Sequence, residues 1–216
     1  RQRHGRPPCT ENDDLSQCGF AVLAYGKLGG LELGYGSDLD LVFVFDDKVN
    51  TGVTDGDKPI EPLMFYTRLA QRMIHFMNTV TAGGILYEVD MRLRPNGLSG
   101  LLVADVSGFE IYQKEEAWTW EHQALVRARC VAGDKGLSNQ ITAIRSEILA
   151  QKRDLTSLIK DVSEMRAKMR EQLNKSTVEL FDLKQGDGGI TDIEFMVQYA
   201  ALALSLIHIL RCRRRG

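Results

Sequence analysis

Residues Leu41 to Phe45 form an apolar run whose two alternating faces are both hydrophobic. A strand of this kind has to be covered on each side, so it belongs in the centre of a sheet with other elements packed against both faces. Asp38 and Asp40 stand directly before the run. The sequence therefore predicts a layered sheet whose central strand begins with two carboxylates.

The remaining segments place short strands first and helices afterwards. Alternating or continuous apolar residues predict the strands, and apolar residues at helical spacing predict the helices. The predicted strands cover residues 20–25, 41–45, 85–93 and 100–104, and the predicted helices cover 61–80, 109–120, 137–150, 154–175 and 189–203. This order favours an α+β fold, with a small sheet domain followed by a helical region.

Charge and cysteine content narrow the class of protein. The chain has 27 Lys and Arg against 29 Asp and Glu, a net charge of −2, which gives no reason to expect a nucleic-acid partner. No apolar run approaches the roughly 20 residues that span a membrane, and the basic start is followed by prolines rather than by the apolar stretch of a secretion signal. The four cysteines are scattered, without the spacing of a zinc or redox site. We therefore expect a cytoplasmic protein with reduced thiols.

Asp38 and Asp40 are two residues apart, so strand geometry points both carboxylates to one face with their Cα atoms about 7 Å apart. Two anions at that separation raise each other's pKa unless a cation joins them. Carboxylate oxygens suit Mg²⁺, which makes a metal site the hypothesis for this pair. A solvated acidic pair at the end of a strand is the alternative for these two residues alone.

A second acidic segment strengthens the metal hypothesis. In residues 87–94, Asp90 lies on the charged face of an alternating pattern together with Glu88, Arg92 and Arg94. If this segment lies next to the central strand, Asp90 completes a three-carboxylate cluster that could hold two metal ions about 3.5–4 Å apart and polarise a phosphate. Arg92 and Arg94 could offset phosphate charge, or they could pair with Glu88 instead.

A glycine-rich turn precedes the carboxylates. Gly26 is separated from Asp38 by eleven residues, and further glycines, including Gly36, crowd that interval. Glycines let backbone N–H groups approach a phosphate closely, and Ser37 adds a hydroxyl donor. The spacing matches neither the P-loop nor the dinucleotide fingerprint, so the turn alone is weak support for nucleotide binding.

These residues together resemble a known superfamily. A glycine, about eleven residues, two aspartates opening an apolar strand and a later aspartate on another strand are similar to the DNA polymerase β-type nucleotidyltransferases. Lys27 departs from the broad pattern, in which many members carry Gly or Ser after the first glycine. Longer strings resemble the glutamine synthetase adenylyltransferases, also called glutamate–ammonia-ligase adenylyltransferases. These strings are residues 26–33, 36–43, 89–95, 120–129 and 188–195.

Within that family, the strings beginning at Tyr25 and Trp120 resemble the C-terminal, adenylylating half of a bifunctional protein rather than its adenylyl-removing half. The resemblance implies ATP-dependent transfer of AMP to a tyrosine hydroxyl of glutamine synthetase, governed by glutamine and the nitrogen-signalling PII protein. Two alternatives stay open: phosphorolysis of adenylyl-tyrosine by the same fold, and a regulatory module that has lost its metal.

The resemblance also implies roles for individual residues. Asp38 and Asp40 would ligate Mg²⁺, and Asp90 would act as the third carboxylate and candidate base. Gly36 and Ser37 would hold the triphosphate of ATP.

The resemblance implies a small nucleotidyltransferase sheet domain with flanking helices, followed by a truncated helical bundle. We expect a linker at 1–18, the nucleotidyltransferase core at 19–106, a helical region at 107–203 and a tail at 204–216. The tail looks like a translated sequencing adaptor, so we expect it to be non-native, and the missing initial Met predicts a piece of a longer protein. Without the four arginines of the tail, 23 basic residues face 29 acidic ones and the net charge is −6.

Overall fold

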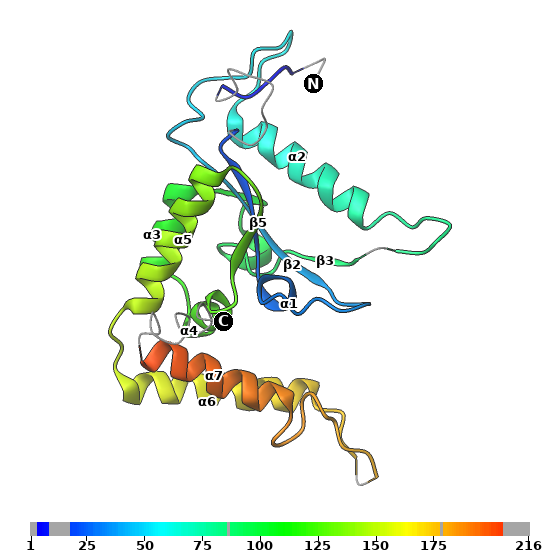
Figure 1. Ribbon diagram of the computed structural model, residues 1–216, viewed down its shortest axis with the longest axis vertical. Coiled ribbons are helices and arrows are strands. Elements are labelled where there is room, and N and C mark those ends of the chain that lie inside the picture. Colours follow the sequence, from blue (N-terminus) through cyan, green and yellow to red (C-terminus); the bar gives the residue numbers. More distant parts are fainter. Residues whose placement is uncertain (1–3, 9–17, 86, 178, 205–216) are drawn as a thin grey trace, which may run out of the picture. The chain divides into compact units, whose positions relative to one another are not determined.

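The chain divides into two compact units in the computed structural model, which describes residues 4–8, 18–85, 87–177 and 179–204 (Figure 1). One unit comprises residues 1–116 with 127–145 and contains the sheet. The other comprises residues 117–126 with 146–216 and is helical in its described part. The predicted α+β class is confirmed. Most of the predicted linker, and the predicted tail except Leu204, lie outside the described residues.

Strand β2 (Leu39–Phe45) is the centre of the sheet. It pairs antiparallel with β1 (Phe20–Ala24), and β1 pairs antiparallel with β5 (Arg129–Gly133). Strands β3 (Val89–Asp90) and β4 (Val103–Asp105) both pair with β2 in parallel, β3 at the start of β2 and β4 at its end. All residues of β1 and all but one of β2 are buried, so the predicted central strand is confirmed.

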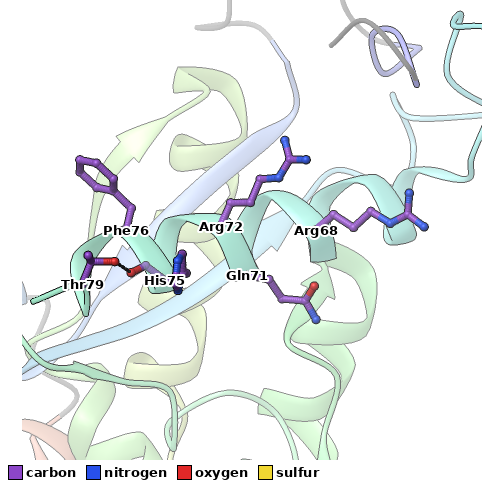
Figure 2. Close-up of a pocket in the computed structure, with 6 residues that line it drawn as sticks. All are labelled: Arg68, Gln71, Arg72, His75, Phe76 and Thr79. Carbon is purple, nitrogen blue, oxygen red and sulfur yellow. Dashed lines mark hydrogen bonds between the residues drawn. The ribbon is translucent and has the colours of Figure 1, made fainter.

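Helices cover the sheet in this unit. Helix α2 (Pro62–Met77) forms the crossover that a parallel pairing of β2 and β3 requires, and its inner face packs into the core. Its outer face is exposed (Figure 2). Helix α3 (Val106–Glu115) and the start of α5 (Lys135–Ala150) lie on the other side of the strands (Figure 1). The short helix α1 (Gly26–Gly29) follows β1, and a 3₁₀ turn, η2 (Gly97–Ser99), follows β3.

An aromatic stack fixes α2 on the sheet. The ring of Tyr66 lies 5.1 Å from that of Phe20 and 5.5 Å from that of Phe45, in stacked geometry. Its hydroxyl donates a hydrogen bond to Asn50 Oδ1 at 3.0 Å. Because Tyr66 is buried and its polar group is satisfied, the residue contributes both apolar burial and orientation to the packing of α2.

The strand predicted over 85–93 is wrong in length, because among its described residues only Val89 and Asp90 pair with β2. The carboxylate of Asp90 accepts a hydrogen bond from the backbone N–H of Arg92 at 2.8 Å, and the Arg94 N–H donates to the Met91 carbonyl. These local bonds turn the backbone out of the sheet, as acidic side chains commonly do at strand ends.

The single helix predicted over 109–120 is wrong as well, since α3 ends at Glu115 and a separate helix, α4 (Thr119–Leu125), follows. The carboxylate of Glu121 accepts the Trp118 backbone N–H at 2.9 Å and starts the new helix. The break coincides with the boundary between the two units.

Strand β5 was absent from the sequence prediction. Its five residues are exposed or half-buried and show no clear alternation, yet the free edge of β1 supplies backbone partners that bring them into the sheet.

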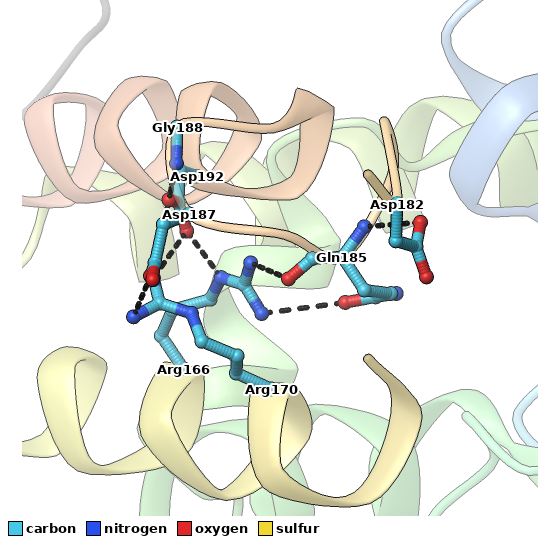
Figure 3. Close-up of polar contacts among 7 residues, drawn as sticks. All are labelled: Arg166, Arg170, Asp182, Gln185, Asp187, Gly188 and Asp192. Atoms are coloured by element: carbon cyan, nitrogen blue, oxygen red, sulfur yellow. Dashed lines mark hydrogen bonds and ion pairs between the residues drawn. The ribbon is translucent and has the colours of Figure 1, made fainter. Parts of the chain in front are cut away.

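In the helical unit, a buried arginine joins α6 (Leu155–Leu173) to α7 (Ile190–Ala203) (Figure 3). Arg166 donates to Asp192 Oδ1 at 2.5 Å and to the Gln185 carbonyl at 2.8 Å. Asp192 also accepts the Gly188 backbone N–H at 2.6 Å and a guanidinium N–H of Arg170 at 3.0 Å. Burial alone would raise the pKa of Asp192, but these hydrogen bonds outweigh it and lower the pKa.

Among the described helices, none is long and apolar enough to cross a bilayer.

We predict that Asp192→Asn lowers the free energy of unfolding by about 3 kcal/mol near neutral pH, because it leaves the buried charge of Arg166 without its carboxylate. The folded-state pKa of Asp192 is depressed, so its contribution is complete above the unfolded pKa of about 4 and is lost as pH falls through the lower folded value. The difference between wild type and variant in urea unfolding should therefore shrink below about pH 4.

The matched control is Asp187→Asn, which removes the same charge from a side chain that is 80% exposed and pairs with Arg170. Its cost should stay below about 1 kcal/mol. Equal losses in the two variants would show that Arg166 does not depend on Asp192.

Candidate active site

Two of the predicted carboxylates face each other across neighbouring strands. The parallel register of β2 and β3 sets Asp40 directly opposite Asp90, and both residues are half-buried. Asp38 stands just before β2 and is exposed. Burial raises the pKa of Asp40 above its ordinary range, and the negative charges of Asp90 and Asp38 raise it further. The three predicted residues therefore lie close enough to interact electrostatically.

Arg92 neutralises Asp90 in this structure. Its guanidinium forms an ion pair with Asp90 Oδ2, through Nη2 and through Nε at 2.7 Å, and its backbone N–H donates to Oδ1. Burial alone would raise the pKa of Asp90, but the hydrogen bonds from Arg92 outweigh it and hold the pKa below the ordinary range. The Arg92 side chain is itself 72% exposed, so it covers the carboxylate from the solvent side.

Arg94 occupies a different position from the one the sequence suggested. Its side chain is buried, and its guanidinium donates to the carbonyls of Met91, Leu98 and Gly100 at 2.8, 3.0 and 3.4 Å. Arg94 therefore braces the loop after β3, and its charge acts on Asp90 only from a distance by lowering its pKa. Three of its N–H groups donate to backbone carbonyls, and its expected role as a phosphate ligand stays a prediction.

The glycine turn presses directly on β2. Gly26 has a positive φ of 53°, and a Cβ at this position would lie 2.3 Å from Asp40 Oδ2, so any other residue would strain the turn and push the Asp40 carboxylate aside. The backbone N–H of Tyr25 donates to the Asp40 carbonyl at 2.9 Å and ties the turn to the strand. The carboxylate of Asp40 is thus held between the turn and β3.

Gly36 and Ser37 form the other end of the glycine-rich segment. Gly36 has a positive φ of 69° and open space where a Cβ would be. The buried hydroxyl of Ser37 accepts hydrogen bonds from the Gly34 N–H and from Lys27 Nζ, both at 3.3 Å. These contacts bring the lysine ammonium group to the loop that leads into β2.

Sequence reasoning missed two arginines that lie beside the turn. Arg127 forms an ion pair with Glu32, and its charge lowers the pKa of Asp40. Arg129 donates to the carbonyls of Gly29 and Leu28 at 3.2 and 3.0 Å, at the end of α1. Both arginines belong to the string that resembles the family; Arg129 begins the unexpected strand β5, and Arg127 lies two residues before it.

The donor chemistry of the three carboxylates fits a hard divalent cation such as Mg²⁺. As they stand, however, the side chains do not converge: within the described ranges, no group of three or more His, Cys, Asp or Glu is gathered closely enough to hold a metal ion. The carboxylate of Asp90 is paired with the guanidinium of Arg92 instead. Metal binding at this site would therefore require Asp90 to exchange Arg92 for the metal.

A central strand carrying Asp40, a parallel neighbour carrying Asp90 and a glycine turn packed against them define a nucleotidyltransferase domain, followed here by helices. Comparison with known families is specific. A family model described as glutamate-ammonia ligase adenylyltransferase matches residues 1–144, and one described as GlnD PII-uridylyltransferase matches residues 159–215.

Curated relatives are similar over nearly the whole chain. A protein of Nitrosococcus oceani is 56% identical over 206 residues, covering 95% of this chain and 21% of the relative. A protein of Alteromonas mediterranea is 57% identical over 203 residues, covering 94% of this chain and 20% of the relative. Both are named bifunctional glutamine synthetase adenylyltransferase/adenylyl-removing enzyme. The chain belongs to the glutamate-ammonia ligase adenylyltransferase family, which confirms the resemblance, and it spans about a fifth of the length of these relatives.

We predict that a ¹³C NMR titration of the carboxyl groups, without metal, finds Asp40 titrating above the ordinary Asp range and Asp90 below it. Arg92→Gln should raise the pKa of Asp90, because burial then acts without the opposing ion pair. The control, Lys48→Gln, removes a charge from an exposed residue elsewhere in the same unit and should leave both pKa values unchanged. An Asp90 pKa that is identical in wild type and Arg92→Gln would refute the ion pair.

Proposed function

We propose that the chain transfers AMP from ATP to glutamine synthetase, and that Asp38, Asp40 and Asp90 carry the reaction. The observation that carries this proposal is the register that sets Asp40 opposite Asp90 on parallel strands beside Gly26. Family membership supports AMP as the transferred group, and the names of the relatives support glutamine synthetase as the target. Tyrosine as the residue that receives AMP rests on the family resemblance.

Asp38 and Asp40 would hold Mg²⁺, with Asp90 as the third ligand. Bound magnesium, in one or two ions, supplies the positive charge that stabilises the triphosphate and lowers the pKa of the attacking hydroxyl. Burial, and then the charges of Asp90 and Asp38, raise the pKa of Asp40, which supports this assignment because a cation would stabilise its charged form.

The triphosphate would lie along the glycine-rich segment, at Gly36 and Ser37. The open space at Gly36 allows close approach to the backbone, and Lys27 at the Ser37 hydroxyl adds a positive charge. Arg127 adds a second positive charge near Asp40. These cations would offset the charge of the leaving pyrophosphate.

In the transfer step, the tyrosine oxygen bonds to the α-phosphorus while the bond from that phosphorus to the bridging oxygen breaks, and pyrophosphate leaves with the bonding electrons. Asp90 accepts the hydroxyl proton. To do so it must first be released by Arg92, whose exposed guanidinium can then pair with phosphate oxygens. Arg92 would thus act on Asp90 before the reaction and on the nucleotide during it.

The proposal extends to control by glutamine and by the PII protein. Its support is the resemblance to the family, and the described residues assign neither effector a site. The reaction would take place in the cytoplasm, as the scattered cysteines suggest.

We predict that the double variant Asp38→Asn with Asp40→Asn loses AMP transfer by roughly 10³-fold or more, because the metal contributes several kcal/mol to the transition state. The measurement is label transfer from α-³²P-ATP to unmodified glutamine synthetase. Asp57→Asn removes a carboxylate from an exposed loop of the same unit and should transfer AMP at the wild-type rate. Undiminished labelling by the double variant would overturn the metal mechanism.

Removal of AMP is the second candidate function, because the relatives carry both activities in their name. The strings beginning at Tyr25 and Trp120 favour the adenylylating half. Incubation with adenylylated and with unmodified glutamine synthetase separates the two functions. Release of ADP from the adenylylated form in the presence of phosphate, without labelling of the unmodified form from ATP, would assign the chain to the removing reaction.

A further inference from the structure

The outer face of α2 carries a cluster of exposed side chains around a hollow of about 480 Å³, and Figure 2 shows them along the second half of the helix. We call this cluster the α2 outer face. Its residues are Arg68, Gln71, Arg72, His75, Phe76 and Thr79. None of them contributes to the core beneath the helix, which is built from the opposite side of α2.

The α2 outer face is basic in a chain that is acidic overall. Helix α2 contains no Asp or Glu, whereas Arg68, Arg72 and His75 all lie on its exposed side. Arg68 Nη1 lies 2.7 Å from a ring nitrogen of His4, and no carboxylate in the described part of the chain pairs with Arg68 or Arg72. Two arginines one helical turn apart that pair with none of the described carboxylates favour an acidic partner.

The same face has an apolar component. Met64 and Phe76 are 50% and 80% exposed and share a four-residue spacing with Arg68 and Arg72, so all four side chains lie along one side of the helix. Aromatic, Met and Arg side chains are the types that protein interfaces enrich over the rest of the surface. This composition fits a protein surface better than a small anion.

The C-terminal end of α2 lies beside the strand that carries Asp90. At the end of α2, Asn78 Oδ1 accepts the backbone N–H of Val89 at 3.2 Å, and Val89 is the residue before Asp90. His75 and Phe76 are within one turn of Asn78, about 5.4 Å along the helix axis. A protein that presents a hydroxyl at Asp90 would therefore extend over this part of α2. A nucleic acid would instead bring its phosphates towards the three carboxylates.

We propose that the α2 outer face binds an acidic surface, with at least one apolar side chain, on the protein that receives AMP. The inference rests on the proposed function for the identity of that protein. Arg68 and Arg72 supply the charge that attracts the acidic surface, and Phe76 supplies a central apolar contact. The face determines which protein is modified, while the carboxylates determine the chemistry.

The test is the double variant Arg68→Glu with Arg72→Glu, in which exposed side chains change sign without disturbing the core. The dissociation constant for unmodified glutamine synthetase should rise about 10-fold or more, and the KM for glutamine synthetase should rise in parallel. The KM for ATP and the rate at saturating glutamine synthetase should stay at wild-type values. Added salt should weaken wild-type binding more than binding by the variant.

The matched control is Lys160→Glu with Lys168→Glu, which makes the same charge change on two exposed residues of α6, in the other unit. The docking proposal is overturned if the two double variants lose the same affinity for glutamine synthetase, or if neither loses any. A change of oligomeric state in the arginine variant also overturns it, because the face would then hold a second copy.

The docking proposal and the proposed function fail in different ways. If wild type transfers AMP and the arginine variant binds glutamine synthetase normally, docking is wrong and the function stands. If wild type binds glutamine synthetase through the arginines but transfers no AMP, the docking site stands and the function is wrong. Absence of any binding by wild type contradicts the docking proposal directly.

Discussion

The site depends on the close packing of the Gly26 backbone against the carboxylate of Asp40. A methyl group on Gly26 would overlap Asp40 Oδ2, so the turn after β1 leaves room for the Asp40 carboxylate only while residue 26 is glycine. The buried pairing of β1 with β2 holds the two segments in this register. Because β3 pairs with the same end of β2, Asp90 lies opposite Asp40 on the next strand.

Electrostatics explain why such an arrangement favours a cation. Burial and two neighbouring anions raise the pKa of Asp40, whereas Arg92 lowers the pKa of Asp90 by pairing with it. Arg92 thus pairs directly with one of the three carboxylates, and Arg127 adds a second positive charge near Asp40. Exchange of Arg92 for magnesium would keep Asp90 next to a cation and release an arginine for the nucleotide.

Much of the site could be predicted from sequence because it is encoded locally. The run of residues 41–45, apolar on both faces, predicted the position of β2. Asp38 and Asp40, two residues apart, were predicted at its start. Alternation could not reveal that β3 is only two residues long, since that length depends on Asp90 accepting the N–H of Arg92. The role of Arg127 was hidden for a similar reason: β5 forms to complete an edge of the sheet and carries no periodic pattern of its own.

The positioning of Asp40 by the glycine turn is tested most directly by the rate of AMP transfer to glutamine synthetase, compared between Gly26→Ala and Gly52→Ala. Both glycines have positive φ, so both substitutions strain the backbone, but only a Cβ on Gly26 collides with Asp40. We predict about 100-fold slower transfer for Gly26→Ala, as expected for a misplaced reacting group, with the far-UV circular dichroism unchanged. The rate for Gly52→Ala should stay within about twofold of wild type, as expected for an exposed loop. Wild-type transfer by a folded Gly26→Ala would contradict the claim that the turn positions Asp40 for catalysis.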